Sequence, residues 1–330
     1  MPKRFLVIQT AFLGDAVLVT SIVEKLHACY PDAAIDLVVR KGNDGLFKGH
    51  PFLHKLYVWD KGQGKTKALF GLISELRKTQ YDHIINAQRF FSTGLMTILA
   101  RGKEKVGYDK NPFSFLFSKK VKHVIGDGRH EVDRLNALIE HLTNGTRPLP
   151  RLYPTAANRT EAHGHMITWP HGHTSYVCIA PASVWFTKQW PAEKWIELID
   201  LLPADQRILL IGAPGDVPLC ERITAAAGRG EILAGKLSLL GTAALMEGAA
   251  MNYVNDSAPL HIASAMNAPV TAIFCSTVPA FGFGPLRENG RVIETMEDLD
   301  CRPCGLHGYK ACPKRHFNCA LGIDIRTVGS

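Results

Sequence analysis

Short apolar runs alternate with amphipathic stretches along most of the chain, and this alternation restricts its possible folds more than any other feature. Continuous apolar runs are typical of buried parallel strands, whereas apolar residues three or four positions apart indicate helices that pack on them. Strands and helices in alternation predict parallel sheets covered by helices on both faces. The predicted strands are 5–8, 35–39, 56–59, 83–86, 176–180, 207–212, 251–254 and 270–274, and the predicted helices of the second half are 192–201, 217–226, 239–249 and 259–266.

The alternation lapses between Asn144 and Tyr176, where prolines and glycines are predicted to break any regular element. A chain of 330 residues is too long for one typical core and fits two domains of average size. We therefore expect an α/β fold with two Rossmann-like, doubly wound domains facing a central cleft. The expected domains are residues 1–160 and residues 161–330, the second ending in a cysteine-rich segment.

The charge balance favours an anionic partner. The chain has 38 Lys and Arg residues against 30 Asp and Glu, a net charge of +8. Nucleic acid, a phosphorylated small molecule and an acidic membrane surface all fit this surplus, and composition does not choose among them. No apolar run reaches the roughly 18 residues that span a bilayer, and the N-terminus does not have the pattern of a signal peptide. We therefore expect a cytoplasmic protein.

Two junctions between a predicted strand and a predicted helix carry an aspartate. Asp15 follows the first strand, and Asp256-Ser257 follows the strand 251–254. Ligands of such sheets bind at the carboxyl ends of strands, where helix N-termini offer free N–H groups. Asp15 is therefore either a helix N-terminal residue or a general base for a substrate hydroxyl. Asp256-Ser257 is either a helix cap or part of a phosphate site.

A loop with two tryptophans around a Thr-Lys pair follows the strand 176–180. Lys188 in this loop can neutralise a leaving diphosphate, because cationic groups stabilise charge that develops on departing phosphate oxygens. The alternative is an exposed lysine among packed aromatic residues.

The eight cysteines fall into two groups. Four are scattered in apolar surroundings and are predicted to be core residues: Cys29, Cys178, Cys220 and Cys275. The other four cluster near the C-terminus: Cys301, Cys304, Cys312 and Cys319. Four thiolates can hold a structural zinc ion, although this spacing is looser than paired CxxC knuckles, and reduced thiols or redox-dependent pairs are the alternatives. His307 and His316 could each replace a thiol.

Several blocks, in order, resemble the bacterial ADP-heptose:lipopolysaccharide heptosyltransferases, glycosyltransferase family 9. The resemblance covers most of the chain, and the cysteine-rich end is similar to the heptosyltransferase II-type branch. The blocks that carry it are Leu13-Gly14-Asp15, Thr187-Lys188-Gln189-Trp190-Pro191, residues 210–216, residues 234–239, Asn255-Asp256-Ser257-Ala258-Pro259-Leu260-His261-Ile262-Ala263, Pro269-Val270 and residues 281–285.

The resemblance implies a GT-B fold and inverting, metal-independent transfer of heptose from ADP-heptose to the lipopolysaccharide inner core. It implies an acceptor on the N-terminal domain, a donor on the C-terminal domain, no cofactor for catalysis and no nucleic acid as partner. Asp15 would be the general base, and Lys188 with Thr187 would stabilise the departing diphosphate. Asp256 would hold heptose hydroxyls, while Ser257, Ala258 and His261 would line the diphosphate site.

One departure from the family pattern concerns the donor. The family block has a glycine where this chain has Ala258, and a methyl group there can crowd the diphosphate. On the acceptor side, a basic surplus suits a phosphorylated or Kdo-bearing lipid at the inner membrane, and a solvated face explains it equally well. Its members are Arg40, Lys41, Lys103, Lys105, Lys119 and Lys120.

Two alternatives accompany the heptosyltransferase interpretation. One is a family member that uses another nucleotide sugar or acceptor in surface-glycan synthesis. The other is a non-catalytic protein that binds nucleotide sugars. Asp15, Lys188 and Asp256 argue against the second alternative, because a protein that only binds needs no base.

Overall fold

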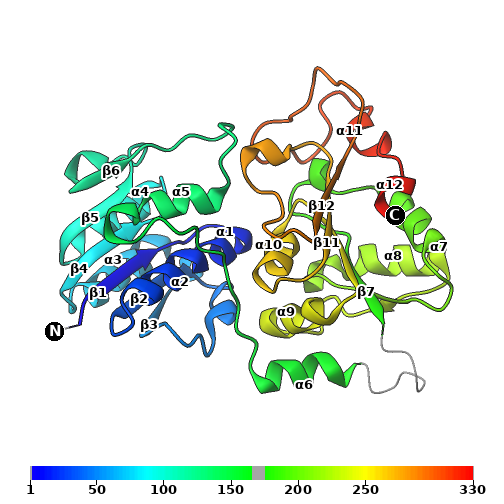
Figure 1. The fold of residues 1–330 in the computed structure, drawn as a ribbon. Coiled ribbons are helices and arrows are strands. Elements are labelled where there is room, and N and C mark those ends of the chain that lie inside the picture. Colours follow the sequence, from blue (N-terminus) through cyan, green and yellow to red (C-terminus); the bar gives the residue numbers. More distant parts are fainter. Residues whose placement is uncertain (1, 166–174, 330) are drawn as a thin grey trace. The chain divides into compact units, whose positions relative to one another are not determined.

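The computed structural model describes residues 2–165 and 175–329 and divides into two compact units, Met1–Tyr153 and Pro154–Ser330 (Figure 1). The domain boundary predicted at residue 160 falls inside a helix, α6 (Ala156–Gly164), that belongs to the second unit. Within the described residues, no helix is long and apolar enough to cross a membrane.

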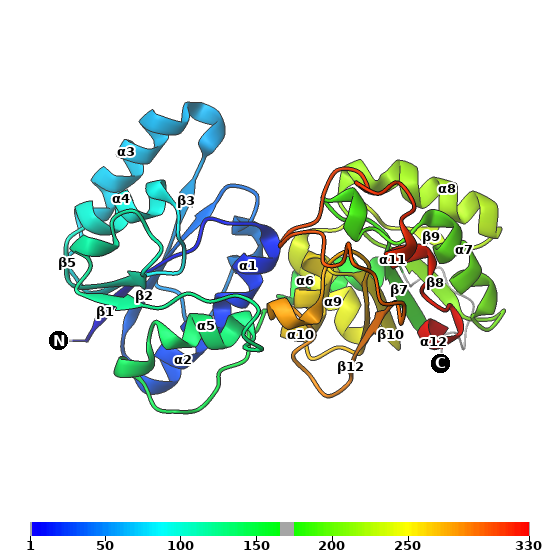
Figure 2. The ribbon, with the colours of Figure 1, turned by 90° about the horizontal axis from the view of Figure 1, so that it is seen from above.

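The first unit is built on one six-stranded sheet in the order β3-β2-β1-β4-β5-β6, with every neighbouring pair parallel. Its strands are β1 (Arg4–Ile8), β2 (Ala34–Arg40), β3 (Lys55–Trp59), β4 (Tyr81–Asn86), β5 (Gly102–Tyr108) and β6 (Lys119–Val121). Its helices are α1 (Leu13–Leu18), α2 (Thr20–Cys29), α3 (Lys65–Leu76), α4 (Phe91–Leu99) and α5 (Glu131–Ala137). Helices α3 and α4 cover one face of this sheet, and α2 and α5 cover the other (Figure 2).

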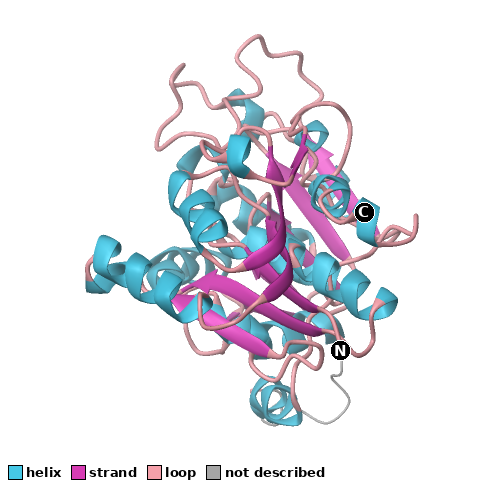
Figure 3. Ribbon diagram, turned by 90° about the vertical axis from the view of Figure 1, so that its left-hand side faces the viewer, coloured by secondary structure: helices cyan, strands magenta, loops and turns pink. Residues whose placement is uncertain are grey.

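The second unit repeats this plan with the order β12-β11-β10-β7-β8-β9, again all parallel. Its strands are β7 (Tyr176–Ala180), β8 (Arg207–Leu210), β9 (Glu231–Ile232), β10 (Met251–Asn255), β11 (Val270–Phe274) and β12 (Gly290–Glu294). Besides α6, its helices are α7 (Ala192–Leu201), α8 (Val217–Ala227), α9 (Leu239–Gly248), α10 (Ala258–Ala265), α11 (Asn318–Leu321) and α12 (Arg326–Gly329). Helices α6, α9 and α10 form one layer, and α7 and α8 form the other. Figure 3, coloured by secondary structure, shows strands with helices on both sides.

Helix α6 corrects the prediction that no regular element lies between Asn144 and Tyr176. Thr155 caps the helix in a reciprocal pair with Asn158, which satisfies two backbone N–H groups of the first turn. Ala162 is its one buried residue, so the helix lacks the apolar periodicity that reveals helices in a sequence. The rest of this stretch, residues 166–174, lies outside the described residues.

Both sheets have the Rossmann strand order, which fixes where ligands bind. The order reverses between β1 and β4 in the first unit and between β7 and β10 in the second. In open parallel sheets, ligands bind outside the carboxyl ends of the strands at this reversal. The loops after β1, β4, β7 and β10 are therefore the candidate functional segments of the two units.

Two glycines inside helices of the first unit meet opposite surroundings. A Cβ atom added at Gly94 in α4 would overlap Asn111 Oδ1 and come within 2.8 Å of Phe113 Cδ2. A Cβ atom added at Gly71 in α3 would have no atom within 4 Å. Gly94 is thus the point where α4 contacts the loop after β5, whereas Gly71 has no packing role.

We predict that a Gly→Ala substitution changes the free energy of unfolding in opposite directions at these two positions. Gly71→Ala should stabilise the protein by about 0.5–1 kcal/mol, because alanine restricts the unfolded chain and favours helix. Gly94→Ala should destabilise it by about 1–3 kcal/mol, because the loop after β5 must move. Thermal melts of the full chain should show these signs, and equal shifts for both variants would contradict the contact.

Candidate functional site

A buried ion pair lies at the carboxyl ends of β7 and β10. Asp256 follows β10, and its Oδ2 atom is 2.7 Å from Lys188 Nζ. The hydroxyl of Thr277 donates a hydrogen bond of 2.6 Å to the same oxygen. The Lys188 and Asp256 side chains are only 15% and 8% exposed. The structure therefore brings together Lys188 and Asp256, two residues that the sequence separates by 68 positions.

Asn255 fixes the loop that carries Lys188. Its Nδ2 group donates to the carbonyl oxygen of Pro181 at 2.8 Å, and its Oδ1 atom accepts from the N–H of Trp190 at 2.9 Å. One buried side chain thus holds both ends of the loop 181–190. Asn255 was part of a family block in the sequence, but no local signal there indicated this contact.

The two tryptophans of that loop differ in their surroundings. Trp190 is buried, packs edge-to-face on Trp195 of α7 at 5.0 Å, and donates from Nε1 to the carbonyl oxygen of Ala320. Trp185 is half-buried. Lys188 is therefore not an exposed lysine among aromatic residues. The buried Trp190 anchors the C-terminal end of the loop in the core.

The N-terminus of α10 presents the other predicted donor residues. Ser257 is the N-cap in extended conformation, and its hydroxyl donates to the carbonyl oxygen of Asn255 at 3.3 Å rather than capping the helix. Ala258 is the first helical residue. His261 lies one turn further on, is 5% exposed and packs edge-to-face on Phe283. N–H groups at such a helix start attract phosphate.

Thr187 lies beside Lys188 in a short 3-10 turn, Phe186–Lys188, and is 1% exposed. Its hydroxyl is hydrogen-bonded to Ser276 Oγ at 3.0 Å and accepts from the N–H of Tyr309 at 2.8 Å. The side chain expected at the diphosphate is thus enclosed by protein groups.

In the first unit, Asp15 lies in the first turn of α1, directly after the loop that follows β1. It is half-buried. Its charge acts on the buried hydroxyl of Tyr108 at the end of β5, whose pKa is raised mainly by burial. Glu131, Arg134 and Arg89 act on the same hydroxyl, so Asp15 belongs to a group of charges at this edge.

Positive and negative charges gather at this edge of the first sheet, where the buried Arg134 pairs with Glu131 at 2.7 Å. The pKa of His123 is lowered to about 4, first by burial and then by the positive charges of three nearby residues: Arg89, Arg134 and Lys110. By contrast, Lys103, which was expected to face an acceptor, lies near the amino end of β5 and pairs with Asp82 at 2.6 Å. Lys41 pairs with Asp60 at 2.7 Å.

Two amides that the sequence did not single out hold the loops at this edge. Gln88 Oε1 accepts from the N–H and the hydroxyl of Thr10, at 3.1 and 2.8 Å. Asn111 Nδ2 donates to the carbonyl oxygen of Gln88 at 3.2 Å. The loops after β1, β4 and β5 are therefore linked in series next to Asp15.

The C-terminal cysteines gather around one small cavity. Cys301, Cys304, Cys312 and Cys319 line a cavity of about 150 Å³ together with His316. Burial and the neighbouring thiols raise the pKa of Cys319 to about 11. The described residues contain no group of three or more His, Cys, Asp or Glu side chains arranged to hold a metal ion. The zinc site therefore stays a prediction from the sequence.

The scattered cysteines differ from this cluster. Cys178, Cys220 and Cys275 are buried, as predicted, and burial raises the pKa of the Cys220 thiol to about 12. Cys29 is half-buried, because it is the last residue of α2.

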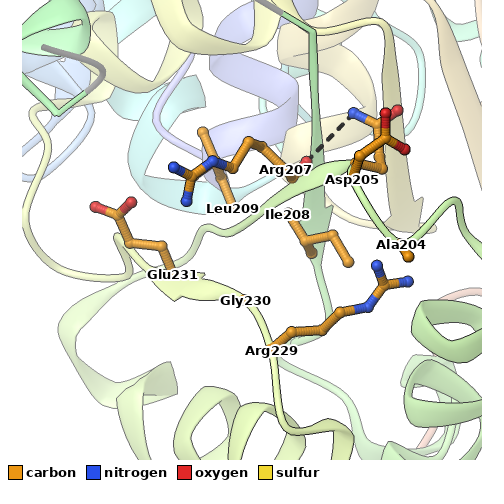
Figure 4. A pocket seen from close by; sticks show the side chains of 9 residues that line it. Ala204, Asp205, Arg207, Ile208, Leu209, Arg229, Gly230 and Glu231 are labelled. Atoms are coloured by element: carbon orange, nitrogen blue, oxygen red, sulfur yellow. Dashed lines mark hydrogen bonds between the residues drawn. The ribbon is translucent and has the colours of Figure 1, made fainter. Parts of the chain in front are cut away.

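A larger cavity, of about 340 Å³, lies beside the amino end of β8 and the segment before β9 (Figure 4). The guanidinium group of Arg229 faces the loop before β8, where it donates to the carbonyl oxygens of Pro203 and Leu202 at 2.7 Å. Because this cavity is at the opposite end of the strand from the loops described above, we assign it no part in the chemistry.

Comparisons with known proteins agree with this arrangement. Residues 69–308 match the model of glycosyltransferase family 9 (heptosyltransferase). Lipopolysaccharide heptosyltransferase 1 of Escherichia coli K12 is 27% identical over 299 residues, 85% of this chain and 91% of that protein.

Two solved structures share the fold. A family 9 glycosyltransferase from Veillonella parvula superimposes with a TM-score of 0.80 at 22% identity, covering 89% of this chain and 86% of that one. The E. coli ADP-heptose lipopolysaccharide heptosyltransferase II gives 0.77 at 20% identity, covering 96% of both chains. These likenesses confirm the predicted GT-B type of α/β fold, and the family match shows that this chain belongs to glycosyltransferase family 9, the heptosyltransferases.

Proposed function

We propose that this enzyme is an inverting transferase that moves heptose from ADP-L-glycero-D-manno-heptose to the lipopolysaccharide inner core, with a lipid A–Kdo–heptose acceptor. The observation that carries the proposal is the buried pair of Lys188 and Asp256 at the strand-order reversal of the second sheet. A relative of the same fold is named for ADP-heptose and lipopolysaccharide, which supports both substrates.

The proposed reaction is a single displacement. The acceptor hydroxyl oxygen forms a bond to the anomeric carbon of heptose while its proton passes to the Asp15 carboxylate. The bond from that carbon to the β-phosphate oxygen breaks, and its electron pair leaves with ADP. The Lys188 ammonium group offsets the charge that develops on the leaving diphosphate, which lowers the barrier.

Asp256 has spare acceptor capacity for the sugar. Its Oδ2 atom already accepts from Lys188 and Thr277, which leaves Oδ1 for a heptose hydroxyl. Ser257, Ala258 and His261 would lie along the diphosphate at the start of α10. Ala258 replaces the glycine of the family block, so a family member with another nucleotide sugar is the second candidate.

Positive side chains at this edge of the first sheet support an anionic acceptor. Lys110 is exposed and Arg89 is half-buried, and after burial their charges add to the lowering of the pKa of His123. Carboxylates of Kdo and phosphates of lipid A are anions that such a surface attracts.

For Asp15→Asn we expect a loss of transfer of about 10²–10⁴-fold, because the amide cannot take the hydroxyl proton. ADP affinity should stay unchanged, since Asp15 belongs to the first unit and the donor residues to the second. The assay pairs ADP-heptose with heptose-deficient lipopolysaccharide, and calorimetry follows ADP. The exposed Asp32→Asn is the matched control. Transfer at the wild-type rate by Asp15→Asn would refute the base assignment.

For Lys188→Gln we expect kcat to fall about 10²–10³-fold, since one charged donor to a leaving group is worth roughly 3 kcal/mol. Because this change removes the charged partner of the buried Asp256, a thermal melt checks that the variant is folded. Lys194→Ala removes a nearby ammonium group that pairs with Glu197 and should leave kcat unchanged. Comparable rates for Lys188→Gln and wild type would rule out the leaving-group role.

Peripheral attachment to the inner face of the inner membrane is the localisation that we propose. Four exposed apolar side chains form an apolar patch near the carboxyl ends of β4 and β5: Phe90, Phe91, Phe115 and Leu116, between 52% and 72% exposed. Phe113 links the two segments, because its ring packs on Phe91 at 4.9 Å. Exposed lysines of the same region are Lys110, Lys120 and Lys122. Apolar side chains with a basic rim match an anionic lipid surface.

We predict that vesicles of phosphatidylethanolamine and phosphatidylglycerol bind the protein, and that Phe115→Ser/Leu116→Ser lowers the bound fraction several-fold in co-sedimentation. Phe70→Ser on α3 changes an equally exposed ring outside the patch and should bind like wild type. Salt should weaken binding, because the basic rim contributes. Equal binding by both variants, or oligomerisation through the patch in place of lipid binding, would overturn this localisation.

A further inference from the structure

Part of the cysteine-rich C-terminal segment is hydrogen-bonded to the loop that carries Lys188. The N–H of Thr187 donates to the carbonyl oxygen of Tyr309 at 3.1 Å. In return, the N–H of Tyr309 donates to Thr187 Oγ1 at 2.8 Å. Thr187 therefore contacts the peptide at Tyr309 through both its backbone and its side chain, and we call this contact the brace.

Gly308 allows the backbone of the C-terminal segment to approach the loop 181–190 closely. A Cβ atom there would lie 2.8 Å from Thr187 Oγ1, 3.1 Å from Lys188 Cγ and 3.2 Å from Ser276 Oγ. Its φ of +77° is also a conformation that residues with a side chain rarely adopt. Any side chain at this position would push against Thr187 and the stem of Lys188.

The C-terminal segment that contains Tyr309 is also hydrogen-bonded to the loop after β11. Arg302 donates to the carbonyl oxygens of Cys275 and Thr277, both at 2.8 Å. The N–H of Cys304 donates to the carbonyl oxygen of Ser276 at 2.8 Å. The same loop supplies Thr277 to Asp256, so the brace and the ion pair share one support.

We propose that Thr187 is a positioning residue, which acts through the brace with Gly308 and Tyr309 to hold the Lys188 ammonium group beside Asp256. This inference rests on the proposed role of Lys188 at the leaving diphosphate. It replaces the direct donor contact that the family resemblance implies for Thr187, because the Thr187 side chain is 1% exposed and its oxygen already has two partners.

Loss of the brace should affect the rate of transfer more than donor binding. Lys188 meets more negative charge in the transition state than in the bound donor, so a displaced ammonium group lowers kcat more than it weakens donor binding. A displacement of about 1 Å can cost about 100-fold in rate. Loss of the brace should therefore change kcat and leave the KM for the donor nearly constant.

The test compares three single variants and one double variant. Thr187→Val keeps the shape and removes the hydroxyl, and Gly308→Ala disturbs the same contact without touching Thr187 chemically. We expect each to lower kcat about 10–100-fold, with the KM for the donor within about threefold of wild type. Thr187→Ser should have a kcat within about threefold of the wild-type value, since serine keeps the hydroxyl oxygen. The double variant should be no slower than the slower single, as expected for residues of one unit.

Gly228→Ala is the matched control for the glycine change, because Gly228 also has a positive φ, +67°, and a Cβ atom there has no neighbour within 4 Å. If Thr187 instead bound the diphosphate of the donor directly, Thr187→Val would raise the KM for the donor as much as it lowers kcat. The two single effects would then multiply in the double variant. Either result would overturn the brace.

A second measurement separates this inference from the proposed function. Reductive ¹³C-methylation reports the Lys188 ammonium group by NMR, with Lys188→Arg to assign its signal. The signal should shift in Thr187→Val and Gly308→Ala and remain in place in Thr187→Ser and Gly228→Ala. No transfer by wild type would refute the proposed function alone, whereas an unmoved signal in Thr187→Val would refute the brace.

Discussion

The candidate site of the second unit depends on the buried ion pair between the Lys188 ammonium group and the Asp256 carboxylate, which are 2.7 Å apart. A charge removed from water is costly unless a partner and further hydrogen bonds compensate it. Thr277 adds a hydroxyl to the pair, and Asn255 ties down both ends of the loop that carries the lysine. Three loops of the sheet, after β7, β10 and β11, are thus coupled through one pair of charges.

In the first unit, neutral amide groups link the loops at the corresponding edge, and charged groups lie among them. Gln88 and Asn111 link the loops after β1, β4 and β5 by amide hydrogen bonds, and Asp15 lies beside them with part of its surface in solvent. Asp15 is half-buried, whereas the Asp256 carboxylate is 8% exposed and bound by Lys188 and Thr277. The two aspartates, similar in sequence context, are therefore suited to different work.

Much of the fold was predictable because parallel strands buried on both faces have continuous apolar sequences. Helix α7 was predicted at its observed bounds, and β7 and β11 likewise. Strand β5 was missed, because its first half reads Lys-Glu-Lys and lies near the edge of the sheet. Helix α6 was missed for the related reason that it buries little apolar surface. Periodicity reports burial, so elements with exposed faces escape it.

The candidate site was predictable only in its chemically distinctive members. Asp15, Lys188 and Asp256 stand at strand ends, where position alone suggests a role. Thr277, Gln88 and Asn111 act through contacts between segments far apart in the chain, and ordinary polar residues give no local sign of such partners. The environment of Thr187 was equally hidden, because Tyr309 reaches it across 122 positions.

The loop 181–190 combines fixed ends with an open middle, and this affects how the family can diversify. Asn255 and the buried Trp190 hold its two ends, while Val184 and Phe186 between them are 76% and 46% exposed. Substitutions at the middle positions leave the backbone supports intact, so they carry little folding cost. Natural variation can therefore change this exposed surface for new substrates while Lys188 keeps its position beside Asp256.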